Sequence, residues 1–142
     1  MYLWDSNILR HFSEGYPVLR KHLLRVPLAE IALPSVVVAE VLRGRCDYAL
    51  KATATQAPMA HRLLVETQHL LQQFNVIVFD QTCAEAMIQL QRVSKSHKRY
   101  ADVMLAATAL AGHHVVVTRN QEHFAGLLPL NRLANWIDIP PA

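Results

Sequence analysis

Three acidic residues could do chemistry, because each lies where an apolar segment meets a polar or basic one: Asp5, Glu40 and Asp102. Partial burial disfavours the charged form of a carboxyl group, and gathering three carboxylates at one site adds mutual repulsion. A hard divalent cation such as Mg²⁺ or Mn²⁺ removes both costs, because carboxylate oxygens are ligands that it prefers. If the three acids converge in the fold, they therefore predict a Mg²⁺ or Mn²⁺ site.

Each acid also has a simpler explanation when it is taken singly. Asp5 could cap a helix that begins near residue 8. Glu40 could pair with Arg43, three residues later on a helix, a contact worth only ~0.2–0.5 kcal/mol. Asp102 could interact with a helix dipole, worth ~0.3–1 kcal/mol. These small terms do not offset the cost of bringing three carboxylates together, so convergence of the acids favours the metal site.

Basic residues gather near these acids and favour an anionic partner. The candidates for contacts with phosphate groups are Arg43, Arg45, Lys98, Arg99 and Arg119. The net charge is +3 and the isoelectric point is near 9.1, which concerns association rather than fold. Solvated helix ends would explain the basic residues alone, whereas basic groups mixed with carboxylates suit a phosphate together with a metal ion.

The composition is that of a folded domain. The 142 residues are 52% hydrophobic and 18% charged, which argues against disorder and predicts one domain over residues 1–142. No apolar run approaches the ~20 residues of a membrane span, and the N-terminus lacks the pattern of a signal peptide. Cys46 and Cys83 are isolated, so neither a zinc site nor a disulfide framework is indicated. We expect a cytoplasmic protein.

Apolar segments alternate with helical patterns, which predicts an α/β chain with a mainly parallel sheet. The predicted strands are 1–4, 29–33, 76–79, 115–118 and a final edge strand at 136–139. The predicted helices are 8–12, 18–26, 35–43, 61–74, 83–93 and 102–112, and Gly44 could either end the third of these or merely interrupt it. The expected N-caps are Ser35 and Asp80, and the expected helix ends are Asn75 and Gly112. Ligands of such sheets bind beyond the carboxyl ends of the strands, where Asp5 and residues 118–120 fall.

The segment 103–111 predicts a buried helix. It contains no charged residue, and small alanine side chains recur along it. A helix that is apolar on nearly every face is packed on several sides, and the run 115–118 suits a parallel strand covered on both faces. Asp102, which opens this helix after a basic segment, is therefore expected at the border between a basic rim and the core.

Four segments, in this order and roughly this spacing, resemble the PIN-domain family: WDSNIL, VVVAEVLRG, ADVMLAATALA and VTRNQEHF. Over residues 2–136 the chain resembles in particular the small VapC-type toxins of bacterial toxin–antitoxin pairs. The resemblance implies a single PIN-like (Rossmannoid) α/β domain, a mainly parallel sheet flanked by helices. It also implies a Mg²⁺- or Mn²⁺-dependent endoribonuclease that hydrolyses RNA phosphodiester bonds.

The residues of the family carry over position by position. Its three acids match Asp5, Glu40 and Asp102, which would hold one or two Mg²⁺ or Mn²⁺ ions and carry the catalysis. The supporting positions match Ser6, Asn7, Thr118 and Asn120. The last of these is often aspartate in the family, so asparagine here removes one charge and leaves open whether one ion or two are held.

The resemblance also implies partners. Such toxins are commonly homodimers, and a cognate antitoxin covers the acidic site with its C-terminal segment. Leu19 and Leu23 could serve that interface if they are exposed, or belong to the core. The alternative is a non-catalytic PIN-like module that binds RNA or protein and is indifferent to divalent ions. A small-molecule phosphatase would need a second aspartate near Asp5, which the sequence lacks.

Overall fold

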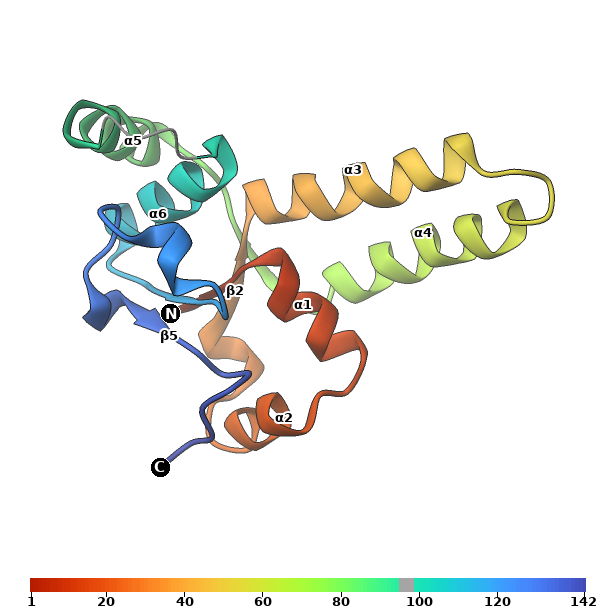
Figure 1. Ribbon diagram of the computed structural model, residues 1–142, viewed down its shortest axis with the longest axis horizontal. Coiled ribbons are helices and arrows are strands. Elements are labelled where there is room, and N and C mark those ends of the chain that lie inside the picture. Colours follow the sequence, from red (N-terminus) through yellow and green to blue (C-terminus); the bar gives the residue numbers. More distant parts are fainter. Residues whose placement is uncertain (95–98) are drawn as a thin grey trace.

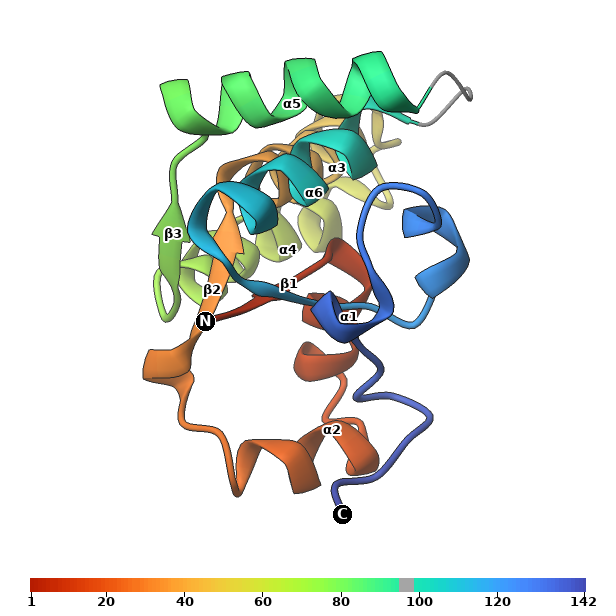
Figure 2. The same cartoon turned by 90° about the vertical axis from the view of Figure 1, so that its left-hand side faces the viewer.

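The structure is a computed structural model of the chain and describes residues 1–94 and 99–142. It has a five-stranded sheet with helices packed around it (Figures 1 and 2). Lys98, one of the predicted phosphate contacts, lies outside the described residues.

The strands are β1 (Tyr2–Trp4), β2 (Ile31–Pro34), β3 (Asn75–Ile77), β4 (Val115–Val117) and β5 (Leu133–Ala134). The α-helices are α1 (Ser6–Ser13), α2 (Pro17–Leu23), α3 (Ser35–Lys51), α4 (Ala57–Leu71), α5 (Gln81–Val93) and α6 (Tyr100–Gly112). Short 3₁₀ helices cover Leu28–Glu30, Gln121–Phe124 and Leu130–Arg132. None of the helices in the described stretches is long and apolar enough to span a bilayer.

All the strand pairings of the sheet are parallel, in the order β3-β2-β1-β4-β5. The predicted α/β fold with a mainly parallel sheet is therefore confirmed. The chain moves outward from β1 to β3 and then returns to place β4 on the other side of β1. The strand order thus reverses at β1 and β4, and ligands of such sheets bind at the carboxyl ends of the strands beside this point.

Helix α6 is the most deeply buried helix, as the sequence predicts. Ala106, Ala107 and Ala109 are 0% exposed, and α6 contacts α5, α3 and β4 (Figure 2). Alanine favours the helical conformation and has a short side chain, so neighbouring elements approach the helix closely on several sides. This packing fixes the N-terminal turn of α6, where Asp102 lies.

Helices α3 and α4 form a long antiparallel pair that projects from the sheet (Figure 1). The sequence leaves open whether Gly44 ends this helix, and α3 continues through Gly44 to Lys51. A Cβ added at Gly44 would meet nothing within 4 Å, so no close approach of another element requires glycine there. Packing of α3 against α4 offsets the weak helix propensity of glycine, which costs about 1 kcal/mol relative to alanine.

One predicted N-cap and one predicted helix end are wrong, and the other predicted N-cap is confirmed. Asp80 caps α5 and accepts from the backbone N–H of Cys83 (3.0 Å). Ser35 is the first residue of α3 rather than its cap, and its Oγ accepts from the backbone N–H of Phe79 (3.0 Å). Helix α4 ends at Leu71, so Asn75 begins β3 instead of closing the helix.

The predicted strand at 136–139 is also wrong, because the edge strand is β5 at Leu133–Ala134. The side chain of Asn135 accepts from the backbone N–H groups of Ile137 and Asp138 (3.0 Å each), which closes a turn after β5. Trp136 and Ile137 are buried by this turn, and Trp136 packs on Trp4 with 6.4 Å between ring centroids. The apolar residues there serve the core without pairing in the sheet.

We predict that Ala106→Leu lowers the free energy of unfolding by about 1–3 kcal/mol, because α6 leaves no room for a larger side chain at this position. Denaturant unfolding measures the change. Ala39→Leu, at an exposed position of α3, is the control and should change stability by less than about 0.5 kcal/mol. An equal effect of the two substitutions would contradict the close packing of α6.

Candidate active site

Asp5 lies at the carboxyl end of β1 and is the N-cap of α1. Its Oδ1 accepts from the backbone N–H of Ile8 (2.9 Å), and its carboxylate also bonds to the backbone N–H of Asn7 and the side chain of Thr118. The backbone N–H of Asp5 donates to Val117 O (3.4 Å). Asp5 therefore both follows a strand and caps a helix, and its hydrogen bonds hold the carboxylate in one orientation.

Thr118 joins the ends of β1 and β4. The side chain is 0% exposed, and the backbone N–H donates to Ala134 O (2.9 Å) in β5. Its hydroxyl donates to the carboxylate of Asp5 and accepts from the backbone N–H of Asn120 (3.1 Å). Both hydrogen-bonding roles of the hydroxyl are thus used, so Thr118 does more than end a strand with a β-branched residue.

Glu40 and Asp102 come from the two helices beside this strand edge. Both are half-buried; Glu40 is on α3, and Asp102 is in the first turn of α6. Glu40 Oε2 is 3.6 Å from Nη2 of Arg99, the residue that precedes α6. Arg43, the partner suggested by helical spacing, acts on Glu40 more weakly than Arg99 does.

The carboxylates influence one another. Burial raises the pKa of Asp5 above its ordinary value of 3.8, and the charge of Asp102 raises it further, against the hydrogen bonds from Thr118 and the backbone. Burial also raises the pKa of Glu40 above 4.5, and the charges of Asp102 and Asp5 add to the increase, while Arg99 and Arg43 oppose it. Three acids far apart in the sequence therefore share one electrostatic environment.

The three acids have the donor chemistry of a divalent cation site. All their donor atoms are oxygen, and a cation would relieve both the burial and the repulsion that raise the pKa of Asp5 and Glu40. Asp5, Glu40 and Asp102 would be the residues that hold it. Within residues 1–94 and 99–142, no three Asp, Glu, His or Cys side chains are arranged as metal ligands in this structure. Small side-chain movements would be needed to bring the carboxylates around one ion.

The predicted phosphate-binding residues differ in their surroundings. Arg43 is exposed and Arg99 contacts Glu40. Arg45 Nε donates to Thr67 Oγ1 (3.1 Å) on α4. Arg119 donates two hydrogen bonds to Asp138, which lies beyond β5: Nε donates to Oδ2 (3.1 Å) and Nη2 donates to Oδ1 (2.9 Å). Arg45 and Arg119 therefore have structural partners that sequence spacing does not show.

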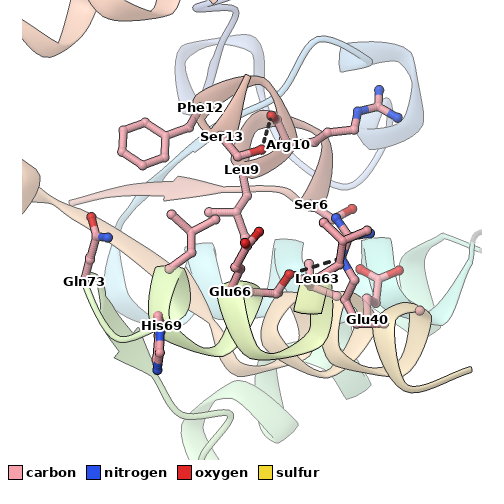
Figure 3. Close-up of a pocket in the computed structure, with 15 residues that line it drawn as sticks. Ser6, Leu9, Arg10, Phe12, Ser13, Glu40, Leu63, Glu66, His69 and Gln73 are labelled. Atoms are coloured by element: carbon pink, nitrogen blue, oxygen red, sulfur yellow. Dashed lines mark hydrogen bonds between the residues drawn. The ribbon is translucent and has the colours of Figure 1, made fainter. Parts of the chain in front are cut away.

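A groove of about 890 Å³ lies between α1, α3 and α4 and includes Glu40 (Figure 3). Its apolar side chains are Leu9, Phe12, Val41, Leu63 and Leu70, and its polar ones include Ser6, Arg10, Arg45 and Glu66. Gly44 lies one helical turn after Glu40 and has no side chain, so the wall of the groove is open at this position. The sequence does not predict this groove, because the groove depends on the spacing of three helices. Gly44 is the local feature of the sequence that is consistent with an open wall there.

Leu19 and Leu23 do not provide an exposed surface. Leu19 is 1% exposed, and Leu23 is half-buried against the same core cluster. The structure thus assigns them to the core, the second of the two roles that the sequence allows.

Comparisons with known proteins agree with this fold. The family described as PIN domain matches residues 2–126. No curated protein matches the sequence. A toxin–antitoxin complex from Klebsiella pneumoniae is similar in structure, with 24% identity, a TM-score of 0.71, and 98% of this chain and 100% of that chain covered.

Two further solved structures are similar. For FitAcB from Neisseria gonorrhoeae the TM-score is 0.74 at 24% identity, with 98% of this chain and 100% of that chain covered. For DNA-bound VapBC from Salmonella typhimurium the TM-score is 0.76 at 20% identity, with 95% of this chain and 97% of that chain covered. At these identities the likeness concerns the fold.

We predict that Asp5→Asn stabilises the protein near neutral pH. Because the pKa of Asp5 is raised in the fold, the folded chain holds this proton more tightly than the unfolded chain. Stability is therefore lost as pH rises from 3.8 through the raised pKa, and asparagine keeps the cap without the charge. Denaturant unfolding across pH should show an advantage for the variant that disappears below 3.8.

Asp80→Asn is the matched control, because Asp80 caps α5 in the same way as Asp5 caps α1. The pKa of Asp80 is lowered from 3.8, chiefly by the N–H of Cys83, so its charged form is the one that the fold favours. Asp80→Asn should therefore lower stability near neutral pH. If both variants lose stability, the fold does not disfavour the charged form of Asp5.

Proposed function

The chain belongs to the PIN-domain family, and on this premise we propose that it is a metal-dependent endoribonuclease that acts as the toxin of a toxin–antitoxin pair. One observation carries the proposal. Asp5 and Glu40, from β1 and α3, both respond to the charge of Asp102 on α6, at the carboxyl end of a parallel sheet. A site that gathers buried negative charge at this edge suits a reaction at a phosphodiester with a divalent cation as cofactor.

The acids of the site would bind the metal, and the neighbouring polar residues would support them. Asp5, Glu40 and Asp102 would hold one or two Mg²⁺ or Mn²⁺ ions, which supply an activated water and stabilise charge on the phosphate. Thr118 holds the carboxylate of Asp5 through its hydroxyl. Ser6, Asn7 and Asn120 support the same two strand ends, with the N–H of Asn7 on Asp5 and that of Asn120 on Thr118.

The basic side chains around the acids would bind the RNA backbone. Arg43 and Arg99 are exposed beside Glu40, and Lys98 precedes Arg99 in the sequence. Arg45 and Arg119 would add contacts from the groove and from the end of β4. Contacts of this kind neutralise phosphates without reading the bases, so the affinity for RNA falls as salt rises.

We further propose that the groove between α1, α3 and α4 receives the antitoxin. The solved structures named above include toxin–antitoxin and VapBC complexes. The groove is lined by both apolar and polar side chains, as a peptide site is, and it includes Glu40, so a segment bound there would reach that acid. We also propose that the protein is a homodimer and is located in the cytoplasm. Cys46 and Cys83 are free thiols, which suits a reduced compartment.

A second candidate is a non-catalytic module that binds RNA or protein. One observation favours it: in the described part of the chain, the acids do not form a ready set of metal ligands. Such a module would keep its RNA affinity in the absence of divalent ions and after loss of any one acid. The two candidates therefore differ in the response to Asp102→Asn and to chelation.

We predict that Asp102→Asn reduces RNA cleavage by about 10²-fold or more, because the site loses one of its three charges. The binding of RNA and the circular dichroism spectrum should be nearly unchanged. The assay is cleavage of labelled RNA with Mn²⁺, with Mg²⁺ and with EDTA. Asp47→Asn, which removes an exposed acid elsewhere on α3, is the control and should cut like the parent. Equal cleavage by Asp102→Asn and the parent would remove the nuclease proposal.

We predict that Gly44→Trp weakens antitoxin binding by about tenfold or more, because the indole would fill a groove wall that is open in the parent. Gly44→Ala is the control, since it adds a methyl group to open space and should bind like the parent. Calorimetric titration with the cognate antitoxin, isolated by its co-purification with this chain, measures the difference. If both variants bind with the parent affinity, the partner does not use this groove.

A further inference from the structure

Arg99 makes an ion pair within the acidic site itself. Its Nη2 is 3.6 Å from Oε2 of Glu40, and the Arg99 side chain is 68% exposed while that of Glu40 is 23% exposed. Glu40 is therefore largely shielded from solvent, and the guanidinium that contacts it is largely exposed. Among the ion pairs of the described residues, this is the one that involves a predicted catalytic acid.

The backbone of Arg99 is fixed while its side chain is not. Arg99 is the N-cap residue of α6, and its carbonyl accepts from the backbone N–H of Val103 (3.1 Å). The side chain makes no capping bond to α6 and reaches across to Glu40 on α3. The same helix end thus presents Asp102 inward and a basic side chain across the opening of the site.

The distance between Arg99 and Glu40 describes a loose contact. A strong hydrogen bond between a guanidinium and a carboxylate is about 2.7–2.9 Å long, and exposed ion pairs beyond this length contribute little stability. The pair nevertheless supplies positive charge where three carboxylates repel one another. A group that is needed electrostatically but held weakly can be displaced by a cation of higher charge.

We propose that Arg99 is a displaceable counterion of the acidic site: it neutralises Glu40 until a divalent cation binds, and the cation then releases it. The inference rests on the proposed function, since the cation is the cofactor of that activity. Arg99 and the cation compete for the same carboxylate, so Arg99 lowers the affinity of the site for metal. The released guanidinium remains at the rim, where an RNA phosphate is a suitable new partner.

Binding of metal and binding of RNA therefore support each other in this scheme. RNA draws Arg99 away from Glu40 and frees the carboxylate for the cation, and the cation in turn frees Arg99 for a phosphate. Linkage requires that the two effects on affinity are equal. Arg99 is a positioning residue in this role, because it acts on the site through Glu40.

The test is Mn²⁺ binding to the full chain, followed by electron paramagnetic resonance of the free ion. Arg99→Gln should bind Mn²⁺ about fivefold more tightly than the parent, because the competing charge is gone. Arg43→Gln removes the same charge from a residue that acts on Glu40 more weakly, and should change the affinity by less than about twofold. Arg99→Lys keeps the charge and should behave like the parent.

A double-mutant cycle isolates the pair. In the Glu40→Gln background the carboxylate that Arg99 neutralises is absent, so adding Arg99→Gln should change Mn²⁺ affinity by less than about twofold. An effect of Arg99→Gln that equals that of Arg43→Gln, or that persists at full size in the Glu40→Gln background, overturns the proposal.

Thermal unfolding gives a second readout that a purely structural role would not produce. In EDTA, Arg99→Gln should melt about 2 °C below the parent, because Glu40 loses its partner. In saturating Mn²⁺ the deficit should vanish, because the cation takes over that role. An equal deficit under both conditions overturns the proposal.

The outcomes separate this inference from the proposed activity. If the parent binds Mn²⁺ with the expected coupling but cuts no RNA, the counterion stands and the nuclease proposal fails. If the parent cuts RNA and Arg99→Gln shows no coupling, the nuclease stands and the counterion fails. A parent that binds no Mn²⁺ overturns both.

Discussion

Negative charge gathered at the edge of a buried core is the constraint on which the rest of this structure depends. Asp5, Glu40 and Asp102 come from a strand and two helices that meet only because β1 lies between β2 and β4. The strand order places the end of β1 at the reversal point of the sheet, while α3 packs against β2 and α6 against β4, the two neighbours of β1. Burial and mutual repulsion raise the pKa of Asp5 and Glu40, so the fold keeps an arrangement that opposes its own stability.

The surrounding residues reduce this cost without removing it. Thr118 and two backbone N–H groups stabilise the charged form of Asp5, while Arg99 stabilises that of Glu40. The alanine-rich α6 holds Asp102 in place, because its packing against α5 and the sheet leaves the helix little freedom. The charge is thus concentrated on a rigid frame, and the ion pair of Glu40 with Arg99, at 3.6 Å, is a loose contact of the site.

Much of the fold follows from local patterns, and the failures have physical reasons. β1, β4 and α6 were predictable because continuous apolar runs mark elements covered on both faces. The edge strand was misplaced, since the side chain of Asn135 closes a turn where apolar residues suggest a strand. The sequence leaves the end of α3 open at Gly44, and packing against α4 outweighs the weak helix propensity of that glycine. In the site, the sequence singles out the acids by their positions at the edge of the core, and their catalytic role stays a prediction. The partners of Glu40, Arg45 and Arg119 were not, because they depend on how separate elements cross.

The central claim is that the three carboxylates form one divalent cation site, and anomalous X-ray scattering from crystals containing Mn²⁺ tests it most directly. We expect an anomalous peak about 2.0–2.3 Å from carboxylate oxygens of Asp5, Glu40 and Asp102, with Arg99 no longer paired with Glu40. A peak elsewhere, or none at saturating Mn²⁺ with Glu40 still paired with Arg99, would contradict it.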